Sequence, residues 1–142
     1  LSLHARAVVR RYRGKVDLWQ LENELNIAGE CTLFGWRRSR AWWSRAFQDD
    51  VIRALHDAVR AEDPAALTTH NISADLKPIP GIYSWKADAR RWARFLDVLG
   101  IDAYPNYLLG WPNRAAVVAD KVRAALALGV NGPAALPNFW LK

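Results

Sequence analysis

Apolar residues recur along the chain at two different spacings, which predict helices and strands in alternation. Spacings of three or four residues, typical of a helix with one buried face, run through residues 4–13, 38–61, 84–99 and 113–128. Short β-prone runs between these stretches predict strands over residues 16–24, 65–71 and 101–104. The predicted order is therefore α-β-α-β-α-β-α.

Residues that favour helix ends lie at the boundaries of these runs. Gly14, Gly100 and Gly129 each follow a helical pattern and are typical of helix stops. Ser84 is of a type that caps a helix start. Regular alternation of strands and helices predicts a parallel sheet with right-handed crossovers. Both a (β/α)8 barrel and an open, flavodoxin-like sheet have this alternation.

The first predicted strand ends in polar groups that can carry chemistry: Glu22, Asn23, Glu24 and Asn26. In α/β barrels the residues at the carboxyl ends of the strands face the active site. A carboxylic acid beside an amide suits sugar chemistry, in which the acid protonates the leaving oxygen and a neighbour holds a ring hydroxyl. Strand periodicity does not separate Glu22 from Glu24, because residues two apart share a face.

The run Trp19-Gln20-Leu21-Glu22-Asn23-Glu24 resembles the fourth-strand motif of the clan A retaining glycoside hydrolases. Members of that family are (β/α)8 barrels in which this strand ends in Asn-Glu. The resemblance implies that Glu24 is the general acid/base and that Asn23 holds the 2-hydroxyl of the sugar. It also implies an oligo- or polysaccharide substrate with β-glycosidic bonds.

Two later stretches resemble the next strands of the same family. Residues 63–71 are similar to the approach to strand five, and residues 99–105 are similar to strand six. Tyr104 stands where many members have a tyrosine that hydrogen-bonds the nucleophile, and Asp102 stands where several have a histidine. The resemblance covers about half a barrel, from helix three to helix six. It predicts a single partial TIM-barrel domain over residues 1–142.

The second carboxylate of a retaining mechanism has no candidate in the expected place. A retaining glycosidase needs a nucleophile about 5–5.5 Å from the acid, and the family supplies it as a Glu that ends strand seven. The corresponding residues 129–142 contain no Asp or Glu, and their prolines and glycines predict an irregular tail. We therefore expect a fragment with negligible activity of its own, which self-associates through open sheet edges.

Other residues of the strand ends and loops extend the candidate site. His70 and Asn71 at the second strand end are candidate sugar contacts. Trp36 and Trp111 fall in predicted loops, where indole rings can stack on sugars. The three histidines and the single cysteine do not have zinc-site spacing, and no glycine-rich phosphate loop occurs in the sequence. The sequence therefore predicts neither a metal ion nor an organic cofactor.

The net charge of +6 comes from two basic clusters, residues 6–15 and 37–45, the second of which is interleaved with tryptophans. Basic residues among aromatics can bind single-stranded nucleic acid. They also fit the solvated faces of amphipathic helices, which we favour. A non-catalytic α/β module that binds nucleic acid or carbohydrate through these surfaces is the alternative. No apolar run approaches the roughly 20 residues of a membrane span.

Overall fold

The computed structural model describes residues 1–27, 44–74, 84–102, 115–128 and 139–141. Strands and helices alternate along it, which confirms the predicted α/β class. In chain order the elements are α1 (Ser2–Tyr12), β1 (Leu18–Asn23), a 3-10 turn η1 (Leu25–Ile27), α3 (Arg45–Glu62), β2 (Leu67–Ser73), α4 (Trp85–Trp92), β3 (Val98–Asp102), α5 (Ala115–Leu126) and β4 (Phe139–Leu141).

The strands form one parallel sheet in the order β1-β2-β3-β4, so each strand pairs with the next one in the chain. This sequential order is that of consecutive units of a (β/α)8 barrel. The three predicted strands are confirmed as parallel, and their carboxyl ends lie at one edge of the sheet. The fourth strand was not predicted: Phe139–Leu141 pairs with β3 inside the segment for which we expected an irregular tail.

Hydroxyl side chains set the starts of two helices. Ser44 caps α3 by accepting a hydrogen bond from the Phe47 N–H, and Ser84 caps α4 in the same way from the Ala87 N–H. The cap at Ser84 was predicted. The second helix, predicted over residues 38–61, corresponds to α3, which begins after Ser44 because the backbone of Ser44 is extended. Residues 38–43 lie outside the described residues.

Two predicted boundaries were wrong. The helix expected over residues 84–99 ends at Trp92, and Gly100 lies inside β3 rather than after a helix. Asp97 causes the early change: its N–H donates to the Thr68 carbonyl, and its carboxylate accepts from the Thr68 N–H at 2.8 Å. These bonds draw the chain into the sheet beside β2. The second strand also continues two residues beyond its predicted end at Asn71, to Ser73.

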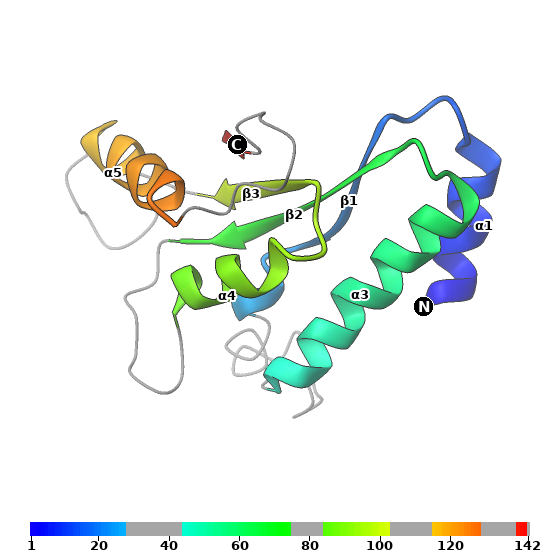
Figure 1. Cartoon of the computed structure of the whole chain (residues 1–142), viewed down its shortest axis with the longest axis horizontal. Coiled ribbons are helices and arrows are strands. Elements are labelled where there is room, and N and C mark those ends of the chain that lie inside the picture. Colours follow the sequence, from blue (N-terminus) through cyan, green and yellow to red (C-terminus); the bar gives the residue numbers. More distant parts are fainter. Residues whose placement is uncertain (28–43, 75–83, 103–114, 129–138, 142) are drawn as a thin grey trace.

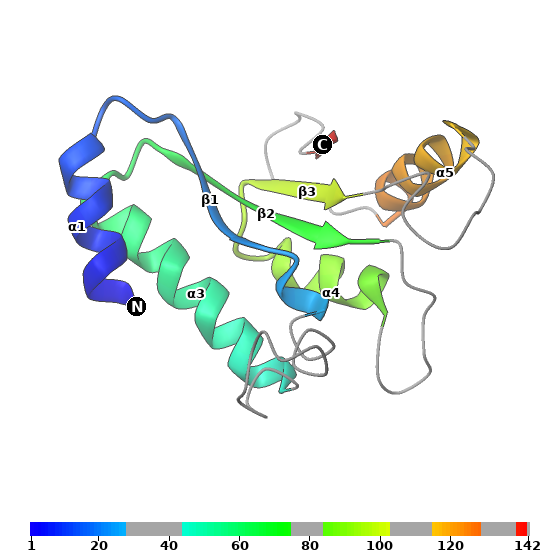
Figure 2. The same cartoon turned by 180° about the vertical axis from the view of Figure 1, so that it is seen from behind.

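Helices α1, α3 and α4 lie along the same side of the sheet (Figures 1 and 2). The core between these layers includes Ile52, Leu55, Ile72 and Trp92. Helix α1 packs on α3, and Arg6 and Arg10 of α1 both form ion pairs with a single carboxylate of α3. Val9 of α1 is buried, whereas Tyr12 at the end of the helix is exposed.

Candidate functional site

A β-bulge in β1 shapes the polar end of this strand. Gln20 pairs with Thr69 of β2, and Asn23 pairs with Asn71. This interval spans three residues along β1 but only two along β2, so β1 has one extra residue there. In a regular strand Gln20 and Asn23 would point to opposite faces. The extra residue brings their side chains together, and the Gln20 Nε2 donates to the Asn23 Oδ1 at 3.1 Å.

Asn71 joins these two side chains from the neighbouring strand. Its Nδ2 lies 3.4 Å from the Asn23 Oδ1 and 3.4 Å from the Gln20 Oε1. Asn71 is buried, while Gln20 and Asn23 are exposed. We call Gln20, Asn23 and Asn71 the amide cluster. Sequence reasoning picked out Asn23 and Asn71 but missed Gln20, because the bulge that turns it toward them leaves no mark in the alternation of apolar residues.

Gly100 of β3 has no side chain, and the amide of Asn71 occupies the space that this leaves. A Cβ atom at this position would stand 2.0 Å from the Asn71 Oδ1 and 3.2 Å from its Cα. Any larger residue would therefore push Asn71 away. Gly100 acts as a close-approach glycine inside a strand, which explains why the interpretation of it as a helix stop was wrong.

Glu24, the predicted acid/base, follows β1 at the same sheet edge, where its N–H donates to the Asn71 carbonyl at 2.9 Å. Its backbone has φ of +50°, the left-handed region that residues with a side chain seldom adopt. The Glu24 carbonyl accepts from the Ile27 N–H and so closes the turn into η1. Strained backbone of this kind is concentrated at functional sites, where the surrounding structure holds it in place.

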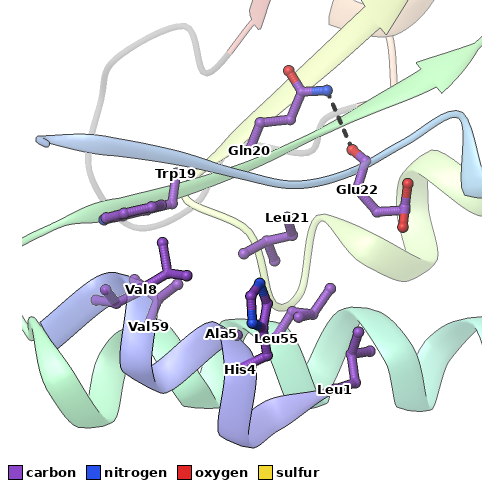
Figure 3. A pocket seen from close by; sticks show the side chains of 11 residues that line it. Leu1, His4, Ala5, Val8, Trp19, Gln20, Leu21, Glu22, Leu55 and Val59 are labelled. Carbon is purple, nitrogen blue, oxygen red and sulfur yellow. Dashed lines mark hydrogen bonds between the residues drawn. The ribbon is translucent and has the colours of Figure 1, made fainter. Parts of the chain in front are cut away.

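Glu22 lies inside β1, directly before Asn23. Its Oε1 accepts a hydrogen bond from the Asn23 N–H at 3.0 Å. It also lines a cavity of about 240 Å³ between α1, β1 and α3, whose walls are mainly apolar. Figure 3 shows Leu21 pointing toward the helices and Gln20 pointing away from them. The bulge thus gives Glu22 and Gln20 different surroundings, although strand periodicity alone would place them on one face.

Asn26 has a structural role. It is fully buried, its Nδ2 donates to the Ser73 carbonyl at 2.9 Å, and its Oδ1 accepts from the Ser73 N–H at 3.1 Å. The side chain therefore pairs with β2 as a neighbouring strand would. This pairing ties η1 to the sheet edge and holds the turn that follows Glu24.

His70 is not brought together with the amide cluster. It is fully buried on the helix side of β2, where its ring meets the Trp92 ring edge-on at a centroid distance of 4.9 Å. Its Nε2 lies 3.4 Å from the Leu25 N–H, from which it accepts. Burial lowers the pKa of His70 to about 3. These contacts support a packing role for this residue.

The buried imidazole predicts acid sensitivity between pH 6.5 and 3. The unfolded chain binds a proton at His70 below about pH 6.5, whereas the folded chain does not until about pH 3. Stability from this group is therefore complete above pH 6.5 and is lost as the pH falls. The unfolding constant should rise by up to about tenfold per pH unit. Urea unfolding at several pH values measures this slope.

His70→Gln serves as the comparison, because glutamine can accept from the Leu25 N–H but does not titrate. The pKa of His56 is also lowered, chiefly by burial, and this group is present in both proteins. Glu62 has its pKa lowered to about 2 by hydrogen bonds from Arg10 and Arg6, so it adds a dependence only below about pH 4.5. An equal slope in both proteins between pH 6.5 and 5 would contradict the prediction.

Several predicted site residues, Tyr104, Trp36 and Trp111, lie outside the described residues. Asp102, at the carboxyl end of β3, is buried, and its carbonyl accepts from the Ala74 N–H at 3.1 Å. Asp102 pairs in register with Ser73. It is the acidic residue that ends the strand next but one to β1.

Metal and membrane sites find no support in the part of the chain that the structure describes. It contains no group of three or more His, Cys, Asp or Glu side chains arranged to hold a metal ion. None of the described helices is long and apolar enough to cross a membrane. In the first basic cluster, Arg6 and Arg10 are engaged by Glu62 at 2.6 and 2.9 Å, so the charge that they offer to a nucleic acid is partly neutralised.

Comparison with known proteins relates the chain to glycoside hydrolases. No family model matches it. It is 28% identical over 141 residues to a phospho-cellobiase of Klebsiella oxytoca, and the match covers 87% of this chain and 30% of that protein. A GH10 endoxylanase from a sugarcane soil metagenome superposes with a TM-score of 0.58 at 15% identity, covering 96% of this chain and 41% of the endoxylanase.

The chain thus spans less than half the length of either protein. Its fold is that of part of a (β/α)8 barrel, as the sequence predicted.

Proposed function

We propose that this chain is the acid/base part of a retaining glycoside hydrolase that cleaves β-glycosidic bonds. Glu24 protonates the leaving oxygen, and Asn23 holds the 2-hydroxyl of the sugar. The observation that carries the proposal is the position of this pair. Both residues lie at the carboxyl edge of a parallel sheet, Asn23 inside an amide cluster and Glu24 on a left-handed turn. Barrel enzymes place their catalytic groups at this edge.

The comparisons support the chemistry without fixing the substrate. The similar proteins are a phospho-cellobiase and an endoxylanase, and both names denote hydrolysis of sugar polymers or oligomers. We infer an oligo- or polysaccharide substrate and a role in carbohydrate metabolism. Asn71 contributes to the site through the amide cluster, and Trp36, Trp111 and Tyr104 are further proposed contacts.

The retaining mechanism also needs a nucleophilic carboxylate about 5–5.5 Å from the acid. Residues 121–142 contain no Asp or Glu, and β4 consists of Phe139, Trp140 and Leu141. Asp102 ends β3, two strands away from β1, and aspartate has a shorter reach than glutamate. We therefore infer that the 142-residue chain binds sugar but does not turn it over. Among the described strands β1 lies at the edge of the sheet, which supports self-association of the isolated chain through this edge.

Titration of the chain with cellobiose, xylobiose and 6-phosphocellobiose tests this function. We expect two-dimensional NMR signals of Asn23 and Glu24 to shift at millimolar sugar, with little change between low and high salt. We also expect no release of aryl groups from aryl β-glycosides above background. Glycosidase turnover that Glu24→Gln abolishes would show that the chain contains a working nucleophile.

The same titration separates sugar binding from nucleic-acid binding. A single-stranded oligonucleotide that binds through phosphate contacts loses affinity steeply as salt rises, whereas a neutral sugar does not. Oligonucleotide binding without sugar binding would contradict the proposed function and support the alternative module.

A further inference from the structure

We propose that Gln20 and Asn71 are positioning residues that fix the orientation of the Asn23 amide, so that its nitrogen faces the substrate. The inference rests on the proposed function for the identity of the ligand. The orientation itself rests on hydrogen bonds within the protein. A side-chain amide has a donor end and an acceptor end, and the polarity of the site depends on which end is turned outward.

The orientation follows from one backbone carbonyl. The Gln20 amide lies 3.4 Å from the Glu22 carbonyl oxygen (Figure 3). A carbonyl oxygen can only accept, so the Gln20 atom facing it is the donor Nε2. That same Nε2 lies 3.1 Å from one atom of the Asn23 amide, and this atom must therefore be the acceptor Oδ1.

The contacts of Asn71, on the neighbouring strand β2, give the same orientation of the Asn23 amide. Because the Nε2 of Gln20 faces the Glu22 carbonyl, the Gln20 Oε1 faces Asn71, which must then present its Nδ2. The Nδ2 of Asn71 also lies 3.4 Å from the Asn23 Oδ1. Gly100 leaves room for the Asn71 Oδ1 on the opposite side. The Asn23 oxygen therefore receives two donors, and its orientation is fixed from two strands.

The outward group of Asn23 is consequently an N–H donor. Asn23 is exposed, and its Nδ2 makes no hydrogen bond to the part of the chain that the structure describes. An N–H donor recognises a sugar through a lone pair on the atom that the contacted ring carbon carries, which is the hydroxyl oxygen in the natural sugar. A hydroxyl satisfies either end of an amide, because it donates and accepts, but a fluorine atom can only accept. The present orientation therefore tolerates fluorine in place of the contacted hydroxyl, and the reversed orientation rejects it.

Gln20→Glu tests the proposal, because it replaces the Nε2 donor with a carboxylate oxygen. The Asn23 oxygen would then face an anion at the shorter of its two contacts, 3.1 Å against 3.4 Å for Asn71. We expect this repulsion to outweigh the bond from Asn71, so that the amide rotates by about 180° and presents its oxygen to the substrate. Gln20 is exposed, so the fold tolerates the change. Gln20→Met is the matched control: it has a similar length and no acceptor, and Asn71 still donates to the Asn23 Oδ1.

Two measurements detect the rotation of the Asn23 amide. Contacts of the Asn23 amide protons in NMR spectra should be to solvent in the wild type and in Gln20→Met, and to the side chain at position 20 in Gln20→Glu. The second readout compares methyl β-glucoside with its 2-deoxy-2-fluoro analogue. The hydroxyl-to-fluorine affinity ratio should rise about threefold to tenfold in Gln20→Glu, the worth of one hydrogen bond, and stay unchanged in Gln20→Met.

The outcomes distinguish this inference from the proposed function. If the wild type binds neither glycoside, the proposed function fails, and the NMR contacts alone decide the orientation of the amide. An outward oxygen in the wild type would overturn the inference. So would Asn23 proton contacts that are the same in the wild type and in a folded Gln20→Glu variant.

Discussion

Replacing Glu24 with Gln is expected to lower turnover of glycosides with poor leaving groups by about 10²- to 10⁴-fold. The form to test is a barrel in which this chain is joined to a strand that supplies the second carboxylate. Glutamine keeps the size and backbone of the residue but has no proton to give at a suitable pKa. Initial rates on unactivated β-linked disaccharides measure the loss.

The leaving group provides the internal control for this prediction. Activated aryl groups need little protonation to depart, so the first step on such substrates should be spared in Glu24→Gln. Glu22→Gln is the matched control at the neighbouring carboxylate, which lines the cavity on the helix side. Equal losses in both variants, or a loss that does not depend on the leaving group, would assign the acid role elsewhere.

Trp92→Ala is expected to reduce the free energy of unfolding by about 3–5 kcal/mol. Trp92 is fully buried in the main core, where it meets the ring of His70 edge-on. Its Nε1 donates to Asp49 of α3 at 2.7 Å, and the same carboxylate forms an ion pair with Arg91 at 2.6 Å. Truncation removes the indole from between α4 and β2 and leaves Asp49 with one fewer donor. Urea unfolding followed by far-ultraviolet circular dichroism measures the change.

Trp92→Phe separates the ring from its hydrogen bond. Phenylalanine fills most of the indole volume and still packs against His70, but it cannot donate to Asp49. We expect it to lose clearly less stability than Trp92→Ala. Because domains of ordinary size are stable by only about 5–15 kcal/mol, the alanine variant should lose a large part of its stability. A loss below about 1 kcal/mol for Trp92→Ala would show that this ring is not central to the core.

The alternation of elements and the polar end of β1 were predictable from sequence for simple physical reasons. Apolar spacing reports burial directly, and a parallel sheet brings the carboxyl ends of its strands to one edge. The cap at Ser84 was predictable because it depends on one local side chain. The resemblance in residues 19–24 then pointed to Asn23 and Glu24, which the structure places at the expected edge of the sheet.

The rest depended on contacts between distant segments. Gly100 belongs to β3 because it lies against Asn71, a contact that helix-stop statistics do not contain. Gln20 joins the amide cluster only through a bulge, which shifts the face of every residue after it. His70 follows the polar pattern of a strand end, yet it faces the helices and packs on Trp92. The short β4 pairs with the edge of β3 that faces away from β2, despite the nearby prolines.

The left-handed backbone at Glu24 lowers the stability of the fold at the same position that carries the proposed acid. A glycine there would adopt the same φ without steric cost, and so would relieve strain of roughly 1 kcal/mol or more. Variants recovered from a random library by heat resistance alone should therefore be enriched in glycine or asparagine at position 24. Such variants would fold better than the parent while losing the carboxyl group. Thermal selection of this protein, without a sugar in the assay, would favour loss of the proposed acid.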